Sequence, residues 1–148
     1  MNDDFLDILR ALIDGQARFL VVGAHAMAVH GVPRATGDLD VWVDSQSENV
    51  GRVWSALLKF GAPVQSLGIS RDDLLVPGTV IQIGMPPRRI DILTQLSGVV
   101  FEDAWKGRTA RTVAGLEIPF LGKAALMKNK KATNRPKDIA DIQELEKE

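Results

Sequence analysis

Residues 37–43 read GDLDVWV, and this short stretch decides both the expected fold and the expected site. The apolar run from Leu39 to Val43 predicts a strand that is partly covered on both faces. Side chains two residues apart on a strand project to the same side, so Asp38 and Asp40 are expected to point together while Leu39 and Val41 face the core. Two carboxylates on one face repel each other unless a cation lies between them. Oxygen ligands of this kind suit magnesium.

An isolated Asp-x-Asp is a weak signal, because two solvated aspartates at the start of a strand are its more common explanation. Asp91 strengthens it, since apolar residues flank this carboxylate on a second expected strand at 89–93. A carboxylate in apolar surroundings is expensive to ionise unless something compensates its charge. A metal shared with Asp38 and Asp40 would do so, and an ion pair with Arg88 or Arg89 is the structural alternative.

The rest of the chain predicts alternating helices and strands. Helices are expected at 3–14, 24–30, from a capping box of Ser45 and Glu48 through Lys59, at 101–106 and 123–132, and from Pro136 onward. Strands are expected at 19–22, 39–43, 79–83, 89–93, 110–114 and 116–120. Between 63 and 78 the pattern predicts only a short helical turn at 70–73. This order is typical of an α/β (α+β) fold, with a mixed sheet flanked by helices and a C-terminal helical tail, in a single domain over residues 1–148.

Composition narrows the functional classes. The chain has 148 residues, of which 45% are hydrophobic and 25% charged, as in ordinary globular proteins. Its net charge of -1 excludes the strongly basic footprint of a general nucleic-acid binder. The absence of cysteine excludes disulfides and cysteine-ligated metals and favours a reducing, cytoplasmic location. The most apolar stretch, residues 19–32, is too short to span a bilayer, so no membrane association is expected.

Residues 21–43 resemble the signature of the polymerase-beta-like nucleotidyltransferase superfamily. In that signature a strand ends in a glycine turn, a short helix follows, and an Asp-x-Asp strand completes the site, with a third aspartate on a later strand where Asp91 stands here. Within the superfamily the chain is similar to small bacterial nucleotidyltransferases related to abortive-infection and toxin–antitoxin systems. Their members often show Arg-x-Thr-x-Asp-x-Asp, as residues 34–40 do.

The C-terminal tail carries a second resemblance to those proteins, over residues 126–142. It implies that Lys130 faces a triphosphate and that Arg135, Lys137 and Asp138 shape the same edge. A solvated helix face is the alternative interpretation of the other tail lysines. The turn departs from the superfamily pattern, because Gly23-Ala24 replaces Gly-Gly or Gly-Ser and so lacks the serine hydroxyl that binds phosphate. Backbone amides at this turn remain available for an anion.

The resemblance implies a metal-dependent transfer of a nucleoside monophosphate from a nucleoside triphosphate to an acceptor hydroxyl, with release of pyrophosphate. Its expected cofactor is Mg²⁺, with Mn²⁺ as the alternative. The acceptor is tRNA, a protein or a small molecule, and a partner protein or a homodimer is also expected. The implied catalytic and metal-binding residues are Asp38, Asp40 and Asp91, and the implied nucleotide-binding residues are Gly23, Ala24, Arg34, Thr36 and Lys130.

Three other functions compete with this one. The first is a nucleotide-binding or regulatory module without turnover, which the alanine at position 24 permits. The second is a partner-binding half of a two-component system, and a metal-dependent nuclease is a distant third. His25 and His30 lie five residues apart and so do not share a helix face, which argues against a zinc pair. A hydrogen-bonded structural role is the expectation for His25 rather than a substrate contact.

Overall fold

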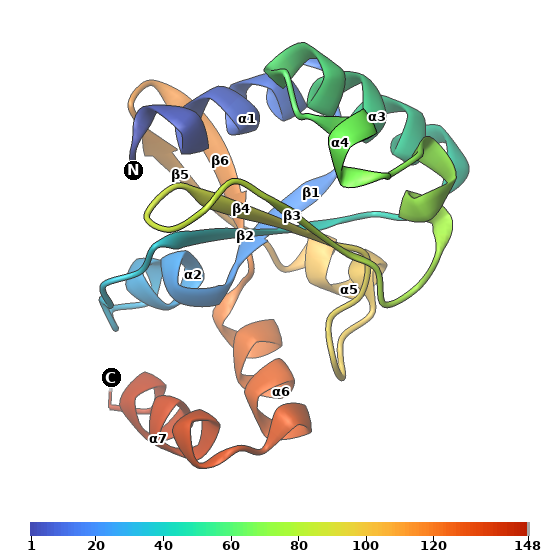
Figure 1. The fold of residues 1–148 in the computed structure, drawn as a ribbon. Coiled ribbons are helices and arrows are strands. Elements are labelled where there is room, and N and C mark those ends of the chain that lie inside the picture. The colour runs from blue at the N-terminus through green and yellow to red at the C-terminus, as the bar shows by residue number, and fades with distance from the viewer. Residues whose placement is uncertain (148) are drawn as a thin grey trace.

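A computed structural model describes residues 1–147, and a six-stranded mixed sheet runs through its middle (Figure 1). The strand order is β3-β4-β2-β1-β6-β5. The strands are β1 (Phe19–Val22), β2 (Asp38–Val43), β3 (Val80–Ile83), β4 (Arg89–Leu93), β5 (Thr109–Val113) and β6 (Leu116–Phe120). β2 pairs in parallel with β4, and β1 pairs in parallel with β6; the other three pairings are antiparallel.

Helices cover both faces of the sheet (Figure 1). One face carries α1 (Asp3–Asp14), α3 (Ser47–Phe60), α4 (Val64–Leu67) and the 3₁₀ turn η1 (Arg71–Leu75). The other carries α2 (Gly23–Val29), α5 (Phe101–Lys106), α6 (Lys123–Thr133) and α7 (Pro136–Leu145), and the α6–α7 hairpin extends away from the sheet. No helix within residues 1–147 has both the length and the apolar character needed to cross a membrane.

Alternation along the strands divides the apolar side chains into two cores. On β1, Phe19 and Val21 belong to the core under α1 and α3, while Leu20 and Val22 belong to the core on the other face. Both sets are nearly inaccessible to solvent, as expected for an interior strand with two covered faces. Asp38, Asp40 and Trp42 of β2 point toward the same face of the sheet as Val22.

The predicted elements are largely confirmed. Every expected strand is present to within one residue, and the mixed α/β architecture with a helical tail is observed. Segment 63–78 contains α4, which periodicity did not predict, and η1, which a Ser70–Asp73 capping box begins. The capping box of Ser45 with Glu48 is wrong. α3 begins at Ser47 with Gln46 as its N-cap and no side-chain cap, because three successive polar residues precede the helix and local sequence does not choose among them.

Asn49 is a polar residue buried in the first turns of α3, and it ties this helix to the sheet. Its side-chain amide accepts a bond from the backbone N–H of Arg18 at 2.6 Å and donates to the carbonyl oxygens of Arg18 at 3.0 Å and Asp44 at 2.7 Å. These contacts satisfy backbone groups at the start of β1 and just after β2. Since buried backbone groups without partners are costly, Asn49 fixes where these two strands begin and end.

We expect Asn49→Ala to lower the free energy of unfolding by about 2–4 kcal/mol, because it orphans several buried backbone groups at once. Urea titration followed by circular dichroism measures this loss. Glu48→Ala, on the exposed side of the same helical turn, is the matched control and is expected to change stability by about 0.5 kcal/mol or less. Equal losses in the two variants would show that the side-chain amide does not hold the strands.

Candidate active site

The parallel pairing of β2 with β4 brings charged side chains together on one face of the sheet. In its register Asp38 lies opposite Arg89, and Asp40 lies opposite Asp91. The intervening residues of both strands face the opposite core and are fully buried. The three aspartates expected to meet are therefore neighbours, on the face covered by α2 and the C-terminal helices.

Arg89 bridges two of these carboxylates. Its Nη2 lies 2.7 Å from Oδ2 of Asp38, and its Nε lies 3.3 Å from Oδ1 of Asp91. The structural alternative of an ion pair between Asp91 and Arg89 is thus observed, whereas Arg88 pairs with the exposed Asp4. The positive charge of Arg89 neutralises part of the carboxylate charge for which the sequence pattern predicts a metal ion.

The carboxylate oxygens nonetheless suit a hard cation. Within residues 1–147, the buried Oδ1 of Asp38 has no hydrogen-bond partner, and the buried Oδ1 of Asp91 has the ion pair with Arg89 at 3.3 Å but no hydrogen bond. Unsatisfied buried carboxylate oxygens are unfavourable unless a donor or a cation reaches them. Across the described part of the chain, no three histidine, aspartate or glutamate side chains are already arranged as a metal-binding group. The donor chemistry fits magnesium, but the guanidinium of Arg89 lies among the prospective ligands.

The pKa values show how strongly these groups interact. Burial raises the pKa of Asp40 to about 6, helped by the neighbouring Asp91 and Asp38 carboxylates and by a hydrogen bond that Asp40 shares with Asp91. Burial also raises the pKa of Asp91, although the Arg89 guanidinium opposes this shift. Asp91 is only 7% exposed. Close carboxylates do not ionise independently, so the cluster holds a proton at Asp40 more readily than an isolated aspartate would.

Gly23 places the turn after β1 directly over this cluster. Antiparallel pairing sets Val22 opposite Asp40, and the next residue, Gly23, turns into α2 with φ of +67°. A Cβ at this position would collide with Oδ2 of Asp40. Glycine is therefore required both by the backbone conformation and by the close approach of the carboxylate.

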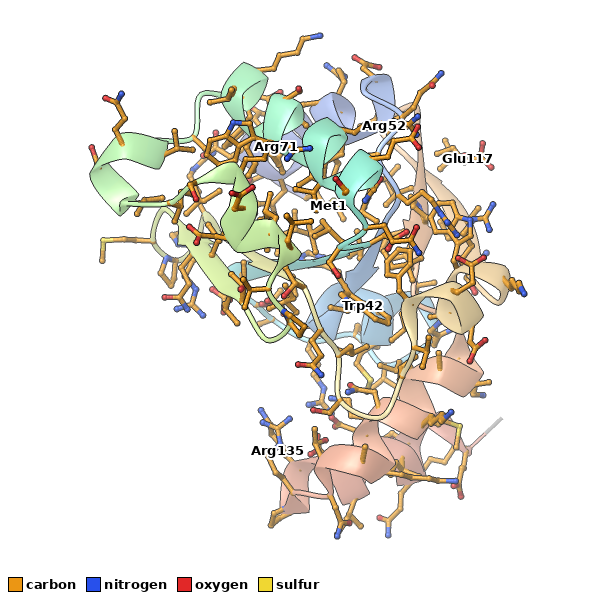
Figure 2. All side chains as sticks on the ribbon, turned by 90° about the vertical axis from the view of Figure 1, so that its right-hand side faces the viewer. Met1, Trp42, Arg52, Arg71, Glu117 and Arg135 are labelled. Carbon is orange, nitrogen blue, oxygen red and sulfur yellow. The ribbon has the colours of Figure 1, made fainter. Side chains whose placement is uncertain are left out.

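A cavity of about 360 Å³ opens beside the turn, between the sheet and the C-terminal hairpin. From the sheet side its lining includes Gly23, Ala24, Arg34 and Asp40, and from the hairpin side it includes Asn129, Lys130, Arg135, Lys137 and Asp141. Figure 2 shows Arg135 on this hairpin, well below the sheet residue Trp42. The cavity is therefore acidic at Asp40 and mostly basic along the hairpin.

Two buried aspartates hold the basic side chains of this cavity. Asp141 is 1% exposed; it pairs with Arg34 of the loop before β2 and, at 3.0 Å, with Nζ of Lys130. Asp138 is fully buried and lies 2.7 Å from Nε of Arg135 and 3.7 Å from Nζ of Lys130. Hydrogen bonds from Arg135 and from Thr133 hold the pKa of Asp138 well below its usual range. The side of the hairpin that faces the cavity therefore carries charged groups.

The structure places the remaining candidates as follows. Arg34 and Lys130 reach the cavity, but each is engaged by Asp141. Thr36 does not line the cavity. Its hydroxyl accepts a hydrogen bond from the backbone N–H of Asp38 at 3.1 Å and donates one to the carbonyl oxygen of Asp38 at 3.2 Å, which fixes the start of β2. His25 packs edge-on against Phe5, and burial lowers its pKa.

Sequence reasoning gave no role to Asp141 and treated Arg89 only as an alternative ion-pair partner. Asp138, Asp141 and Leu145 follow one another at helical spacing and are all buried. Two acidic residues at apolar positions of an amphipathic helix are the signal that would have indicated Asp141. No comparable local signal exists for Arg89, because its link to Asp38 depends on strand register.

Comparison with known proteins shows the fold. No family model and no curated protein matches the chain. Among solved structures, a protein of Thermotoga maritima described as a "putative nucleotidyltransferase" superimposes with a TM-score of 0.61, over 97% of this chain and 93% of the other, at 15% sequence identity. The chain therefore has a nucleotidyltransferase-like fold.

The raised pKa of Asp40 predicts a pH-dependent stability. Because the folded pKa of about 6 exceeds the ordinary value of 3.8, the stabilisation is full below about pH 4 and is lost as the pH rises through 6. The amide of Asp40→Asn can donate the same bond without ionising. In EDTA, we expect this variant to be about 1–2 kcal/mol more stable than the wild type at pH 7.5, after allowing for solvent screening, and nearly equal at pH 4. Urea unfolding across this range measures the difference, and a constant offset would contradict it.

The close approach of Gly23 to Asp40 predicts an unusually costly alanine substitution. Gly31, which has φ of +93° and no atom within 4 Å of the position that a Cβ would occupy, provides the matched control. Gly31→Ala is expected to lose about 1–2 kcal/mol of stability from backbone strain alone. Gly23→Ala should lose at least about 1 kcal/mol more, because the methyl group displaces the Asp40 carboxylate. Chemical denaturation of both variants tests this, and equal losses would rule out the contact.

Proposed function

We propose that this chain binds a nucleoside triphosphate with Mg²⁺ and transfers the nucleoside monophosphate to an acceptor hydroxyl. The observation that carries the proposal is the convergence of Asp38, Asp40 and Asp91 on paired strands, with Asp40 lining a cavity beside the Gly23 turn whose far wall is basic. The nucleotidyltransferase-like fold supports it, as does the resemblance of the two sequence motifs. Manganese is the alternative ion, because it accepts the same oxygen ligands.

In this proposal each part of the site has a distinct task. Asp38, Asp40 and Asp91 would hold the divalent cation, and the buried Oδ1 atoms of Asp38 and Asp91, which have no hydrogen bond within residues 1–147, would be available to it. A bound divalent cation supplies charge neutralisation for the phosphates and for the attacking and leaving oxygens. The backbone of Gly23 and Ala24 lines the same cavity and approaches the phosphates from the sheet side.

The hairpin side of the cavity would bind the triphosphate. Arg135 and Lys137 are exposed at its edge, where phosphate oxygens can reach them, although Arg135 also pairs with Asp138. Arg34 and Lys130 already have a partner in Asp141 and would share their donors between that carboxylate and the ligand. Electrostatic stabilisation from such positioned cations is the main contribution that proteins make to phosphoryl-type transfer.

The transfer balances as a simple substitution at phosphorus. The acceptor oxygen forms a bond to the α-phosphorus, the bond from that phosphorus to the bridging oxygen of the β-phosphate breaks, and pyrophosphate leaves. The proton of the acceptor hydroxyl passes to a carboxylate oxygen of Asp91, whose raised pKa makes it a better base than an ordinary aspartate. The acceptor remains tRNA, a protein or a small molecule, in a cytoplasmic setting.

A second candidate is a nucleotide-binding module without turnover. Two observations favour it: Ala24 has no hydroxyl to bind phosphate, and Arg89 occupies the acidic cluster as its counter-ion. The resemblance to toxin–antitoxin nucleotidyltransferases would then correspond to a regulatory half of a two-component system, acting with a partner protein or as a homodimer. Such a protein binds nucleotide and metal but releases no pyrophosphate.

Calorimetric titration with ATP, CTP, GTP and UTP in MgCl₂ tests the site itself. We expect at least one nucleotide to bind the wild type and to lose roughly tenfold or more of its affinity in Asp38→Asn/Asp40→Asn, because the metal-bound phosphates lose two ligands. Asp14→Asn/Asp72→Asn, which removes two exposed carboxylates elsewhere, is the matched control and should bind like the wild type.

Turnover separates the two candidates. Transfer of radiolabelled nucleotide, with release of pyrophosphate, should disappear in Asp91→Asn if Asp91 takes the acceptor proton. Nucleotide binding without any pyrophosphate release from the wild type would favour the second candidate. Equal nucleotide affinity in the wild type and Asp38→Asn/Asp40→Asn would refute both.

A further inference from the structure

Arg89 is held inside the acidic cluster by the geometry of the sheet. It stands opposite Asp38 in the β2–β4 register and two residues before Asp91 on its own strand. Its guanidinium consequently contacts the carboxylates of both, at 2.7 Å and 3.3 Å. The side chain is about two-thirds buried, so these contacts are shielded from water more than a surface ion pair is.

The contacts of Arg89 overlap with those that a divalent cation would make. Asp38 and Asp91 supply oxygens to the guanidinium, and the same two carboxylates belong to the proposed metal ligands. A carboxylate that is bonded to an arginine is a poorer ligand, since part of its charge is already neutralised. The fixed positive charge also repels a second cation placed a few ångströms away. Both effects oppose metal binding while Arg89 keeps its position.

The same contacts stabilise the protein when no metal is bound. Without Arg89, three carboxylates would face one another on a half-buried surface, and their repulsion would have to be relieved by protonation or by local opening. Arg89 therefore contributes most to stability in the metal-free protein. In the metal-bound protein the cation provides the same neutralisation with twice the charge.

We propose that Arg89 is a built-in counter-ion that substitutes for the divalent cation and sets its affinity, because metal binding must displace the guanidinium from Asp38, Asp91 or both. This inference rests on the proposed function, since it uses the same three carboxylates as metal ligands. It assigns Arg89 a positioning role rather than a catalytic one. The protein thus exchanges one cation for another in the same acidic cluster.

Manganese titration by calorimetry, without nucleotide, tests the exchange directly. We expect Arg89→Gln to bind Mn²⁺ roughly tenfold more tightly than the wild type, which corresponds to about 1.4 kcal/mol. Arg89→Met, which removes the charge but keeps an unbranched apolar stem, is the second neutral variant in case the first does not fold. Arg89→Lys keeps the positive charge and should bind Mn²⁺ much as the wild type does.

Arg88→Gln is the matched control, because Arg88 is the adjacent residue, is exposed, and pairs with Asp4 at 3.2 Å outside the cluster. It loses the same formal charge and should leave the Mn²⁺ affinity unchanged within about twofold. Thermal melting gives an independent readout. In EDTA, Arg89→Gln should melt at a lower temperature than the wild type, and saturating Mn²⁺ should raise its melting temperature by more than it raises that of the wild type.

Each outcome bears on the inference. Tighter Mn²⁺ binding in the neutral Arg89 variants, abolished when Asp38→Asn/Asp40→Asn is added, supports it. A lower melting temperature with Mn²⁺ affinity equal to or weaker than that of the wild type would show a structural ion pair only; this overturns the inference and leaves the proposed function standing. Absence of Mn²⁺ binding in the wild type and in every variant would overturn the inference, whereas the nucleotide titrations in MgCl₂ decide the proposed function separately.

Discussion

The parallel pairing of β2 with β4 is the constraint on which the site depends. Side chains alternate between the faces of a strand, so a register shift of one residue would turn every side chain to the wrong face. Leu39, Val41, Ile90 and Ile92 fill the core under α1 and α3 and are essentially inaccessible to solvent. Their burial holds the register at which Asp40 meets Asp91. The hydrophobic core on one face thereby positions the charged cluster on the other.

The neighbouring strand adds the glycine turn to this cluster. β1 runs antiparallel to β2, and the chain leaves β1 next to Asp40 before it turns into α2. The turn is close enough to exclude any side chain at Gly23, so the backbone and the Asp40 carboxylate share one small space. The cavity beside them is lined by both the Gly23-Ala24 turn and the Asp40 carboxylate. This proximity follows from the antiparallel register of β1 and β2 and from the conformation of Gly23.

Local pattern predicts much of this arrangement, and long-range pairing accounts for the rest. The six strands, the fold class and the common face of Asp38 and Asp40 follow from periodicity, which short segments determine by themselves. The bridge from Arg89 to Asp38 joins residues 51 positions apart and exists only in the observed register. The N-cap of α3 is Gln46, one residue after the expected Ser45, because the polar residues before the helix offer competing starts. Sequence periodicity also gives no indication that Asp141 reaches Arg34, since that contact joins α7 to the loop before β2.

The C-terminal hairpin shows why a site, rather than stability, best explains its buried charges. An amphipathic helix would ordinarily bury apolar side chains at the positions of Asp138 and Asp141. Buried ion pairs lose so much hydration that apolar residues of similar size usually stabilise a fold at least as well. The pairs with Lys130, Arg135 and Arg34 therefore contribute chiefly by fixing basic groups along the cavity. On the hairpin, Asp138 and Asp141 orient basic side chains. On the sheet, three carboxylates share the single guanidinium of Arg89. The two groups therefore carry complementary charge. The metal-bound nucleoside triphosphate that we propose as ligand would complement this distribution of charge.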